Sequence, residues 1–187
     1  MIWFTSDWHF NHDKPFIYES RDFSSIEEMN EIIIARHNCI VRPEDKVIVL
    51  GDLMLGGSDK LEAGIKLIER LNGHLTIIRG NHDTNKRWEA YAQLYPKIEN
   101  MMVASFFKYK KYHFYLSHFP AITTNFDQDK PLKERTLSLA GHSHTKNKFQ
   151  DMQYGCYHVE IDCHNLMPVS IEEIIQDYKS FWSDMTR

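Results

Sequence analysis

The chain has few cysteines, no long apolar run and no long basic block. Cys39, Cys156 and Cys163 are too few, and odd in number, for a disulfide framework, so we expect reduced thiols in a cytoplasmic protein. No apolar run approaches the roughly 20 residues that cross a bilayer. No basic leader precedes the apolar start at Ile2. We therefore predict neither a membrane span nor a signal peptide.

The charge balance disfavours nucleic acid as a partner. The formal net charge is −4 with histidines neutral, and the densest basic cluster is Lys108, Lys110 and Lys111, interleaved with Tyr109 and Tyr112. This cluster could contact a phosphate backbone, but a solvated strand or hairpin face is the preferred interpretation. Tight, sequence-independent binding of nucleic acid usually needs a larger basic surface.

In the first half of the chain, short apolar runs typical of strands alternate with segments whose apolar residues recur at helical intervals. We predict strands at residues 2–5, 46–50 and 75–78, a helix from Ser24-Ser25 to just before Pro43, and a second helix at about 59–71. The continuous β-branched run at 46–50 is typical of a strand buried on both faces. This alternation predicts an α/β core.

The second half predicts more strands and a closing helix. Residues 103–107 and 112–116 are predicted as neighbouring, antiparallel strands, with further strands at 136–140 and 157–161. Ser170 and Glu173 form a capping-box pattern that opens the last helix. With 187 residues and no repeat or linker, we predict one domain, residues 1–187. Its class is α/β, a two-sheet β-sandwich flanked by helices, with the site at the strand ends.

Five short motifs carry imidazole or oxygen donors, most of them directly after an apolar run. They are Asp7-Trp8-His9, Gly51-Asp52, Gly80-Asn81-His82-Asp83, Ser117-His118 and Gly141-His142-Ser143-His144. The first, second and fourth motifs are weak alone, because polar loops, turns and structural histidines use the same residues. The Gly80 motif is a sharper signal, and the alternating His142 and His144 resemble paired ligands. Together the five motifs favour a metal-dependent hydrolase over a generic globular domain, and their donors suit Mn²⁺, Fe²⁺, Ni²⁺ or Zn²⁺.

Local chemistry suggests a role for several of these residues. Asp7 and His9 alternate past a strand end, so both side chains are expected in one concavity. Gly80 is expected to allow a tight turn, Asn81 to offer its carbonyl oxygen to a metal, and His82 to lie beside the substrate. Asp83 is expected to hold the His82 ring by accepting its other N–H.

The pattern D-x-H, G-D, G-N-H-[DE], H and G-H-x-H spans residues 7–144 and resembles that of the calcineurin-like metallophosphoesterase superfamily. Residues 6–12 resemble a compact microbial and phage-type branch that has an extra histidine, His12, soon after the first motif. Asn11 stands where that branch usually has glycine. Residues 162–174 are also similar to the closing strand and helix of small members.

The resemblance implies two divalent metal ions, Mn²⁺ first, with Fe, Ni or Zn as alternatives. The first ion would be held by Asp7, His9, Asp52 and His144, and the second by Asp52, Asn81, His118 and His142. A metal-activated water would attack phosphorus, while His82 assists the leaving group and Asp83 orients His82. His12 is either a substrate contact or a structural histidine.

We expect a phosphodiesterase, because the chain has no room for a large cap domain and the site should be open to an extended or cyclic substrate. The expected substrate is a small phosphorylated compound, with nucleotide-derived compounds as candidates. A phosphomonoesterase or protein phosphatase, a nuclease and a non-catalytic scaffold of the same fold remain as alternatives. The remaining histidines have no motif support, so structural or exposed roles are expected for His37, His74, His113, His158 and His164.

Overall fold

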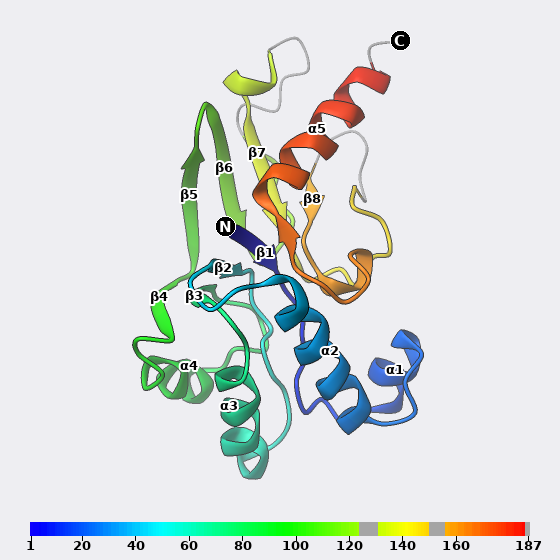
Figure 1. Cartoon of the computed structure of the whole chain (residues 1–187), viewed down its shortest axis with the longest axis vertical. Helices are drawn as coiled ribbons and strands as arrows, with labels where there is room; N and C mark the ends of the chain where they lie inside the picture. The colour runs from blue at the N-terminus through cyan, green and yellow to red at the C-terminus, as the bar shows by residue number, and fades with distance from the viewer. Residues whose placement is uncertain (124–130, 150–155, 186–187) are drawn as a thin grey trace.

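The computed structural model describes residues 1–123, 131–149 and 156–185 (Figure 1). The strands in these ranges are β1 (Ile2–Thr5), β2 (Lys46–Val49), β3 (His74–Ile78), β4 (Ile98–Met102), β5 (Ala104–Tyr109), β6 (Tyr112–Ser117), β7 (Thr136–Ala140), β8 (Tyr157–His158) and β9 (Val169–Ser170). The α-helices are α1 (Pro15–Tyr18), α2 (Ile26–Ile40), α3 (Leu61–Glu69), α4 (Asn85–Ala92) and α5 (Ile171–Met185). No helix within these ranges has the length and apolar composition that crossing a membrane requires.

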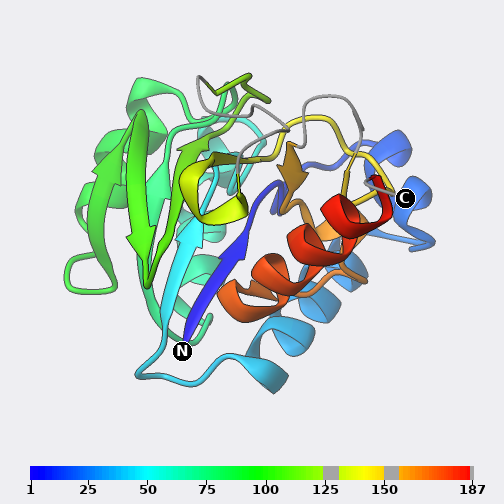
Figure 2. The same cartoon turned by 90° about the horizontal axis from the view of Figure 1, so that it is seen from above.

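The strands form two sheets. The first has the order β4-β3-β2-β1-β9, in which β1 to β4 run parallel and β9 pairs antiparallel with β1. The second has the order β5-β6-β7-β8, with an antiparallel pair β5–β6 followed by parallel partners. Helices α2, α3 and α4 lie beyond the first sheet, and α5 runs beside β1 and β9 (Figures 1 and 2). The predicted fold class, two sheets flanked by helices, is confirmed.

Side-chain alternation in the first sheet divides the core in two. Val47, Val49, Leu75 and Ile77 belong to the apolar cluster that includes the buried sides of α2 and α3. Their neighbours Ile48, Leu50 and Ile78 belong to the cluster that includes the second sheet and α5. Because β2 is covered on both faces, its sequence is continuously apolar, as predicted.

The predicted capping residues begin two helices. Ser25 Oγ accepts a hydrogen bond from Glu28 N–H (3.1 Å) at the start of α2, and the Glu28 carboxylate accepts one from Ser24 N–H (2.9 Å). Ser170 Oγ accepts from Glu173 N–H (3.2 Å) at the start of α5. These contacts satisfy backbone donors that a helix leaves unpaired at its first turn.

Most predicted elements agree with the observed ones to within about two residues, and two differ in kind or extent. The helix expected at 59–71 is a 3₁₀ turn (Ser58–Lys60) followed by α3, and the strand expected at 157–161 ends at His158. The strand ends early because Val159 N–H bonds to Ala140 O of the second sheet, whereas Ile161 N–H bonds to Ser6 O beyond the first sheet. The chain crosses between the sheets there, so it cannot continue one ladder. It then forms a 3₁₀ turn, Ile161–Cys163.

His37 is a buried histidine that supports the loop of the first motif. Its ring packs edge-on against the buried Trp8, with 5.7 Å between ring centroids, and its Nε2 lies 3.0 Å from Asn72 O. Burial lowers the pKa of His37 to about 4. The folded protein therefore holds a neutral imidazole where the unfolded chain would bind a proton.

This linkage predicts an acid-sensitive contribution to stability. As pH falls from about 6.5 toward 4, protonation favours the unfolded chain, and the loss of unfolding free energy approaches about 3 kcal/mol. With chelator present, urea unfolding at pH 7.5 and 4.5 should show a smaller loss for His37→Gln than for the wild type. His113→Gln, on the exposed side of β6, is the control. Equal losses in the wild type and His37→Gln would contradict the prediction.

Candidate metal centre

Loops that follow β1, β2, β3, β6 and β7 meet at the carboxyl ends of these strands. Backbone hydrogen bonds join the loops: Asp7 N–H donates to Gly51 O (3.1 Å), and Gly141 N–H donates to His118 O (3.0 Å). The predicted metal ligands all lie in these loops: Asp7, His9, Asp52, Asn81, His118, His142 and His144. This edge is where open α/β sheets usually bind their ligands.

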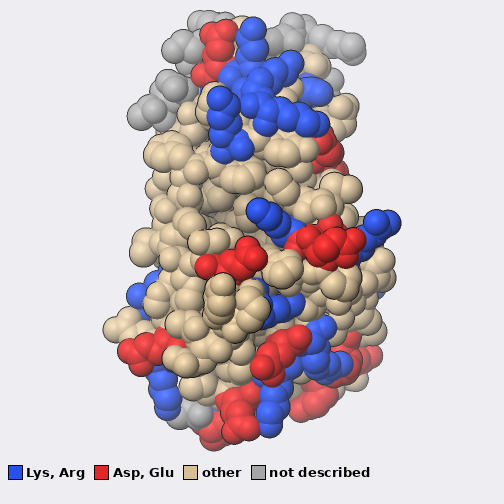
Figure 3. Space-filling model, turned by 60° about the vertical axis from the view of Figure 1, so that its left-hand side comes forward, with Lys and Arg blue, Asp and Glu red and all other residues tan. Residues whose placement is uncertain are grey.

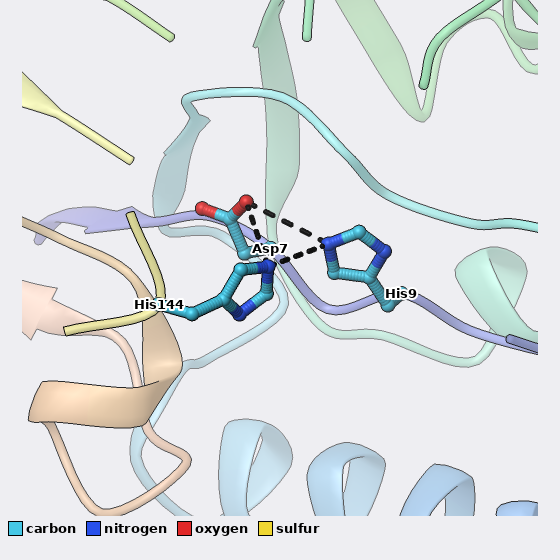
Figure 4. Close-up of side chains that lie close together, drawn as sticks. All are labelled: Asp7, His9 and His144. Atoms are coloured by element: carbon cyan, nitrogen blue, oxygen red, sulfur yellow. Dashed lines mark hydrogen bonds and ion pairs between the residues drawn. The ribbon is translucent and has the colours of Figure 1, made fainter. Parts of the chain in front are cut away.

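Asp7, His9 and His144 form the first group of possible ligands, and Figure 4 shows their side chains pointing toward one another. His9 Nε2 lies 3.1 Å from His144 Nε2 and 3.7 Å from Asp7 Oδ1. Asp7 Oδ1 is 3.9 Å from His144 Nε2. Asp52 Oδ2 lies 3.8 Å from His9 Nε2, so Asp52 adjoins this group.

Asn81, His118 and His142 surround the other side of Asp52. Asn81 Oδ1 lies 2.8 Å from His118 Nε2 and 2.9 Å from His142 Nδ1. Asp52 Oδ2 lies 3.5 Å from His118 Nε2. The structure thus brings all seven predicted residues together, with Asp52 between two groups of donors.

The donor atoms fit two divalent cations. Asp7 Oδ1 is buried and has no hydrogen-bond partner within the described residues. Leu50 O holds His118 Nδ1 (2.7 Å), and Asp162 Oδ2 holds His144 Nδ1 (2.9 Å). In the neutral tautomers that these bonds favour, both Nε2 atoms lack a proton and face the centre. A cation at the first group would give Asp7 Oδ1 a partner, and one at the second would lie between His118 Nε2 and Asn81 Oδ1, which are both acceptors in this tautomer.

The two buried carboxylates ionise differently in the metal-free protein. Burial raises the pKa of Asp52 to about 7, with further contributions from the charges of Asp7 and Asp83. Burial also opposes ionisation of Asp7, but the close His9 ring and then the charge of His118 favour its carboxylate and hold its pKa at about 2. A cation between the carboxylates would favour the charged form of Asp52 as well.

Five of the predicted ligands have left-handed backbone conformations. The φ angles are 58° for Asp7, 51° for His9, 56° for Asp52, 75° for His142 and 49° for His144. Such conformations cost about 1–3 kcal/mol each and cluster at functional sites. Asp7 and His9 point into one concavity, as expected, and the intervening Trp8 is buried in the core. The backbone at both residues is left-handed, however, and not extended as in a strand.

Two motif glycines allow the loops to approach closely. A Cβ atom on Gly80 would collide with the Asp52 carboxylate, and one on Gly141 would collide with Asp7 Oδ2. We expected Gly80 to allow a tight turn, but Gly80 does not have a positive φ, so a turn alone does not explain why glycine stands there. At both positions the missing side chain gives the space that a carboxylate of the centre occupies.

Arg21 and Asp162 support the centre and were missed by the motif analysis. Their side chains form a buried ion pair (2.8 Å), and Arg21 also donates to Asp7 O (2.8 Å) and Trp8 O (3.2 Å). Asp162 holds the His144 ring, as described above. Arg21 therefore links the loop of the first motif to the carboxylate that orients His144. No local pattern distinguishes Arg21 in the sequence, and only the similarity of residues 162–174 drew attention to Asp162.

The expected contact between Asp83 and the His82 ring is wrong. Asp83 is buried, and its carboxylate accepts from Gly80 N–H (2.8 Å), Asp52 N–H (2.9 Å) and the Tyr91 hydroxyl (3.1 Å). Backbone donors are favourable partners for a buried carboxylate. Asp83 thus fixes the loop of Asp52 against its own loop.

We predict that Asp83→Asn lowers the free energy of unfolding by about 2–3 kcal/mol, because the amide would direct N–H groups at backbone N–H donors. Tyr91→Phe removes one donor and should cost about 1 kcal/mol. Urea unfolding measures both values. Unchanged stability in Asp83→Asn, with only turnover reduced, would instead support orientation of the His82 ring.

His82 and His12 lie beside the first group. The His82 side chain is 42% exposed, and its Nε2 lies 3.9 Å from Asp52 Oδ2. His12 is buried between His9 and His82, with ring centroids 5.3 and 6.3 Å away. Burial lowers the pKa of His12 to about 4, so near pH 7 it offers a neutral ring. Asn11 has a φ of 60°, the conformation for which glycine is favoured.

The other histidines lie outside both groups. His74 lies 3.3 Å from a Glu99 carboxylate oxygen, and His158 lies 3.1 Å from a Glu160 carboxylate oxygen. His164 Nε2 contacts His158 O at 2.9 Å. Together with buried His37 and exposed His113, these residues have the structural or exposed positions that we expected.

Comparison with known proteins identifies the family. The family model for calcineurin-like phosphoesterases matches residues 1–186. The chain is 33% identical over 181 residues to the uncharacterized protein MJ1445 of Methanocaldococcus jannaschii, covering 94% of this chain and 89% of that protein. It is 25% identical over 164 residues to the gene 66 protein of Mycobacterium phage L5, covering 76% and 77% of the two chains.

A solved structure has a similar fold. The protein of unknown function AQ665 from Aquifex aeolicus aligns with a TM-score of 0.70 at 22% identity, over 94% of this chain and 98% of that one. The chain belongs to the calcineurin-like phosphoesterase family. Family membership and the two Asp/His groups make it a metal-dependent phosphoric ester hydrolase.

Proposed function

We propose that the protein is a binuclear phosphodiesterase for small phosphorylated substrates, nucleotide-derived compounds among them. The positions of three arginines carry this proposal. Arg21 is paired with Asp162, Arg79 donates to Asp83 O and to the Asn85 side chain, and Arg87 donates to His82 O and Gly56 O. These guanidinium groups are occupied in holding loops, whereas a dianionic monoester would favour arginines directed at its phosphate.

The proposed ligands are Asp7, His9, Asp52 and His144 for the first ion and Asp52, Asn81, His118 and His142 for the second. Mn²⁺ is the first ion to test, with Fe, Ni and Zn as alternatives, because the donors are carboxylate, amide oxygen and imidazole. Bound divalent ions would supply Lewis-acid stabilisation of phosphoryl oxygens and make a water acidic near neutral pH. The chain itself orients the donors through Leu50 O and Asp162.

His82 is proposed to donate a hydrogen bond or a proton to the leaving oxygen. Its side chain is partly exposed beside Asp52, and Arg87 holds its backbone through His82 O (2.5 Å). Asp83 positions the same loop through backbone contacts. His12, behind His82, is proposed as a positioning residue for the rings of His9 and His82.

Charge placement supports a small substrate over nucleic acid. Lys and Arg gather at the upper end of the face in Figure 3, where Figure 1 places the β5–β6 turn that carries Lys110 and Lys111. His118 follows the opposite end of the six-residue strand β6, about 20 Å away. Lys110 is also paired with Glu172 (2.7 Å). A nuclease would be expected to place such a cluster beside its metals.

Hydrolysis of bis-p-nitrophenyl phosphate and p-nitrophenyl phosphate by Mn²⁺-reconstituted protein tests the proposal. We expect a higher kcat/KM for the diester and loss of turnover in His142→Ala. For a diester with a poorer leaving group, His82→Ala should lower kcat by about 10²-fold or more, since proton transfer then matters most.

The matched control is His113→Ala, which removes an exposed histidine from β6 and should retain wild-type turnover. Preference for the monoester would contradict the phosphodiesterase assignment. Unchanged turnover in His82→Ala with the poorer leaving group would remove His82 from the chemistry.

A further inference from the structure

Two exposed phenyl rings adjoin the histidines of the candidate metal centre. Phe16 is 67% exposed and Phe119 is 52% exposed. Tyr95 and Phe106 are more exposed still, so exposure alone does not mark a binding site, and the neighbours of the two rings carry the argument. Phe119 contacts histidines of the second group of donors. Phe16 contacts His12, which packs against His9 of the first group.

Phe119 adjoins the second group. Its ring centroid lies 4.6 Å from that of His142 and 5.2 Å from that of His118, at 64° and 73° between planes. The backbone is fixed next to the ligand, because Ser117 Oγ donates to Phe119 O (2.7 Å) and Pro120 follows. The histidines therefore meet only part of the ring, and about half of the side chain stays open to solvent.

Phe16 adjoins the first group through His12. The ring centroids of Phe16 and His12 are 5.7 Å apart with the planes at 86°, and His12 in turn packs against His9 and His82. Helix α1, which carries Phe16, is anchored by buried Ile17. Phe16 therefore presents an exposed ring beside His12, which packs against the histidine that we propose for leaving-group chemistry.

A diester bound at the centre has two organic groups, and they must extend away from the phosphorus over the surrounding surface. Rings beside the two groups of donors would lie where these groups extend. Flat rings stack on phenyl faces with little dependence on polar contacts, whereas alkyl groups gain only apolar contact. The positions of the rings thus bear on substrate choice as well as on packing.

We propose that Phe16 and Phe119 form an aromatic subsite for the organic groups of the substrate, which selects phosphodiesters that carry an aromatic ring, such as a nucleobase or an aryl group. This inference rests on the proposed phosphodiesterase function. It assigns the two phenyl groups to substrate binding, and it predicts selectivity between ring-bearing and alkyl esters at the same metal centre.

The test compares two diesters with the same leaving group, phenyl p-nitrophenyl phosphate and methyl p-nitrophenyl phosphate, using the Mn²⁺-loaded full chain. The ratio of their kcat/KM values should fall about tenfold in Phe119→Leu or Phe16→Leu, because leucine keeps apolar packing but cannot stack. Phe106→Leu is the matched control, since Phe106 is 77% exposed on β5. That variant should keep the wild-type ratio.

Equilibrium binding gives a second readout that does not need turnover. Isothermal titration with phenylphosphonate and methylphosphonate should show a phenyl preference that the Phe16 and Phe119 variants lose. Equal ratios in the wild type and both variants would overturn the aromatic subsite and leave the phosphodiesterase proposal standing. Lost phenyl preference without turnover of either diester would support the subsite and overturn the proposed function.

Discussion

The structure depends on placing two carboxylates together in a buried, histidine-rich centre. Potential ligand atoms of Asp7, Asp52 and His118 all lie within 4.8 Å of one another. Two like charges at that distance repel by at least about 3 kcal/mol at an effective dielectric constant near 20. The raised pKa of Asp52 reflects its burial first and then this crowding. Bound cations would convert the same arrangement from a cost into a source of stability.

The scaffold offsets this cost with hydrogen bonds to the surrounding loops. Asp83 holds the loop of Asp52, and the Arg21–Asp162 pair holds the first loop and the His144 ring. Left-handed backbone at the ligands and missing side chains at Gly80 and Gly141 let the loops approach. These features fix the positions of the ligand side chains, so the centre is preorganised before any ion binds.

Much of this organisation could be predicted from the sequence, and the failures have physical causes. Residues 46–50 were predicted as a buried strand because both faces of β2 pack into apolar clusters. Strand β4 was missed because it lies at the sheet edge, where Glu99 and Asn100 are exposed and the apolar pattern is interrupted. Helix α4 was missed because Tyr91 is its single fully buried residue.

The candidate site, like the fold, could be predicted from the sequence only in part. Its seven predicted ligands lie in short motifs after strands, where spacing carries information. The partners of Asp83 and the role of Arg21 depend on contacts between distant loops, including an ion pair across 141 residues of chain. Local spacing does not encode such contacts, so sequence reasoning assigned Asp83 to its neighbour His82.

The most direct test of this account is anomalous diffraction from Mn²⁺-loaded crystals, recorded on both sides of the manganese absorption edge. The account predicts two manganese peaks about 3.5–4 Å apart. Asp7, His9 and His144 should bind one, Asn81, His118 and His142 the other, and Asp52 both. A single peak, or two peaks that Asp52 does not join, would contradict the binuclear centre.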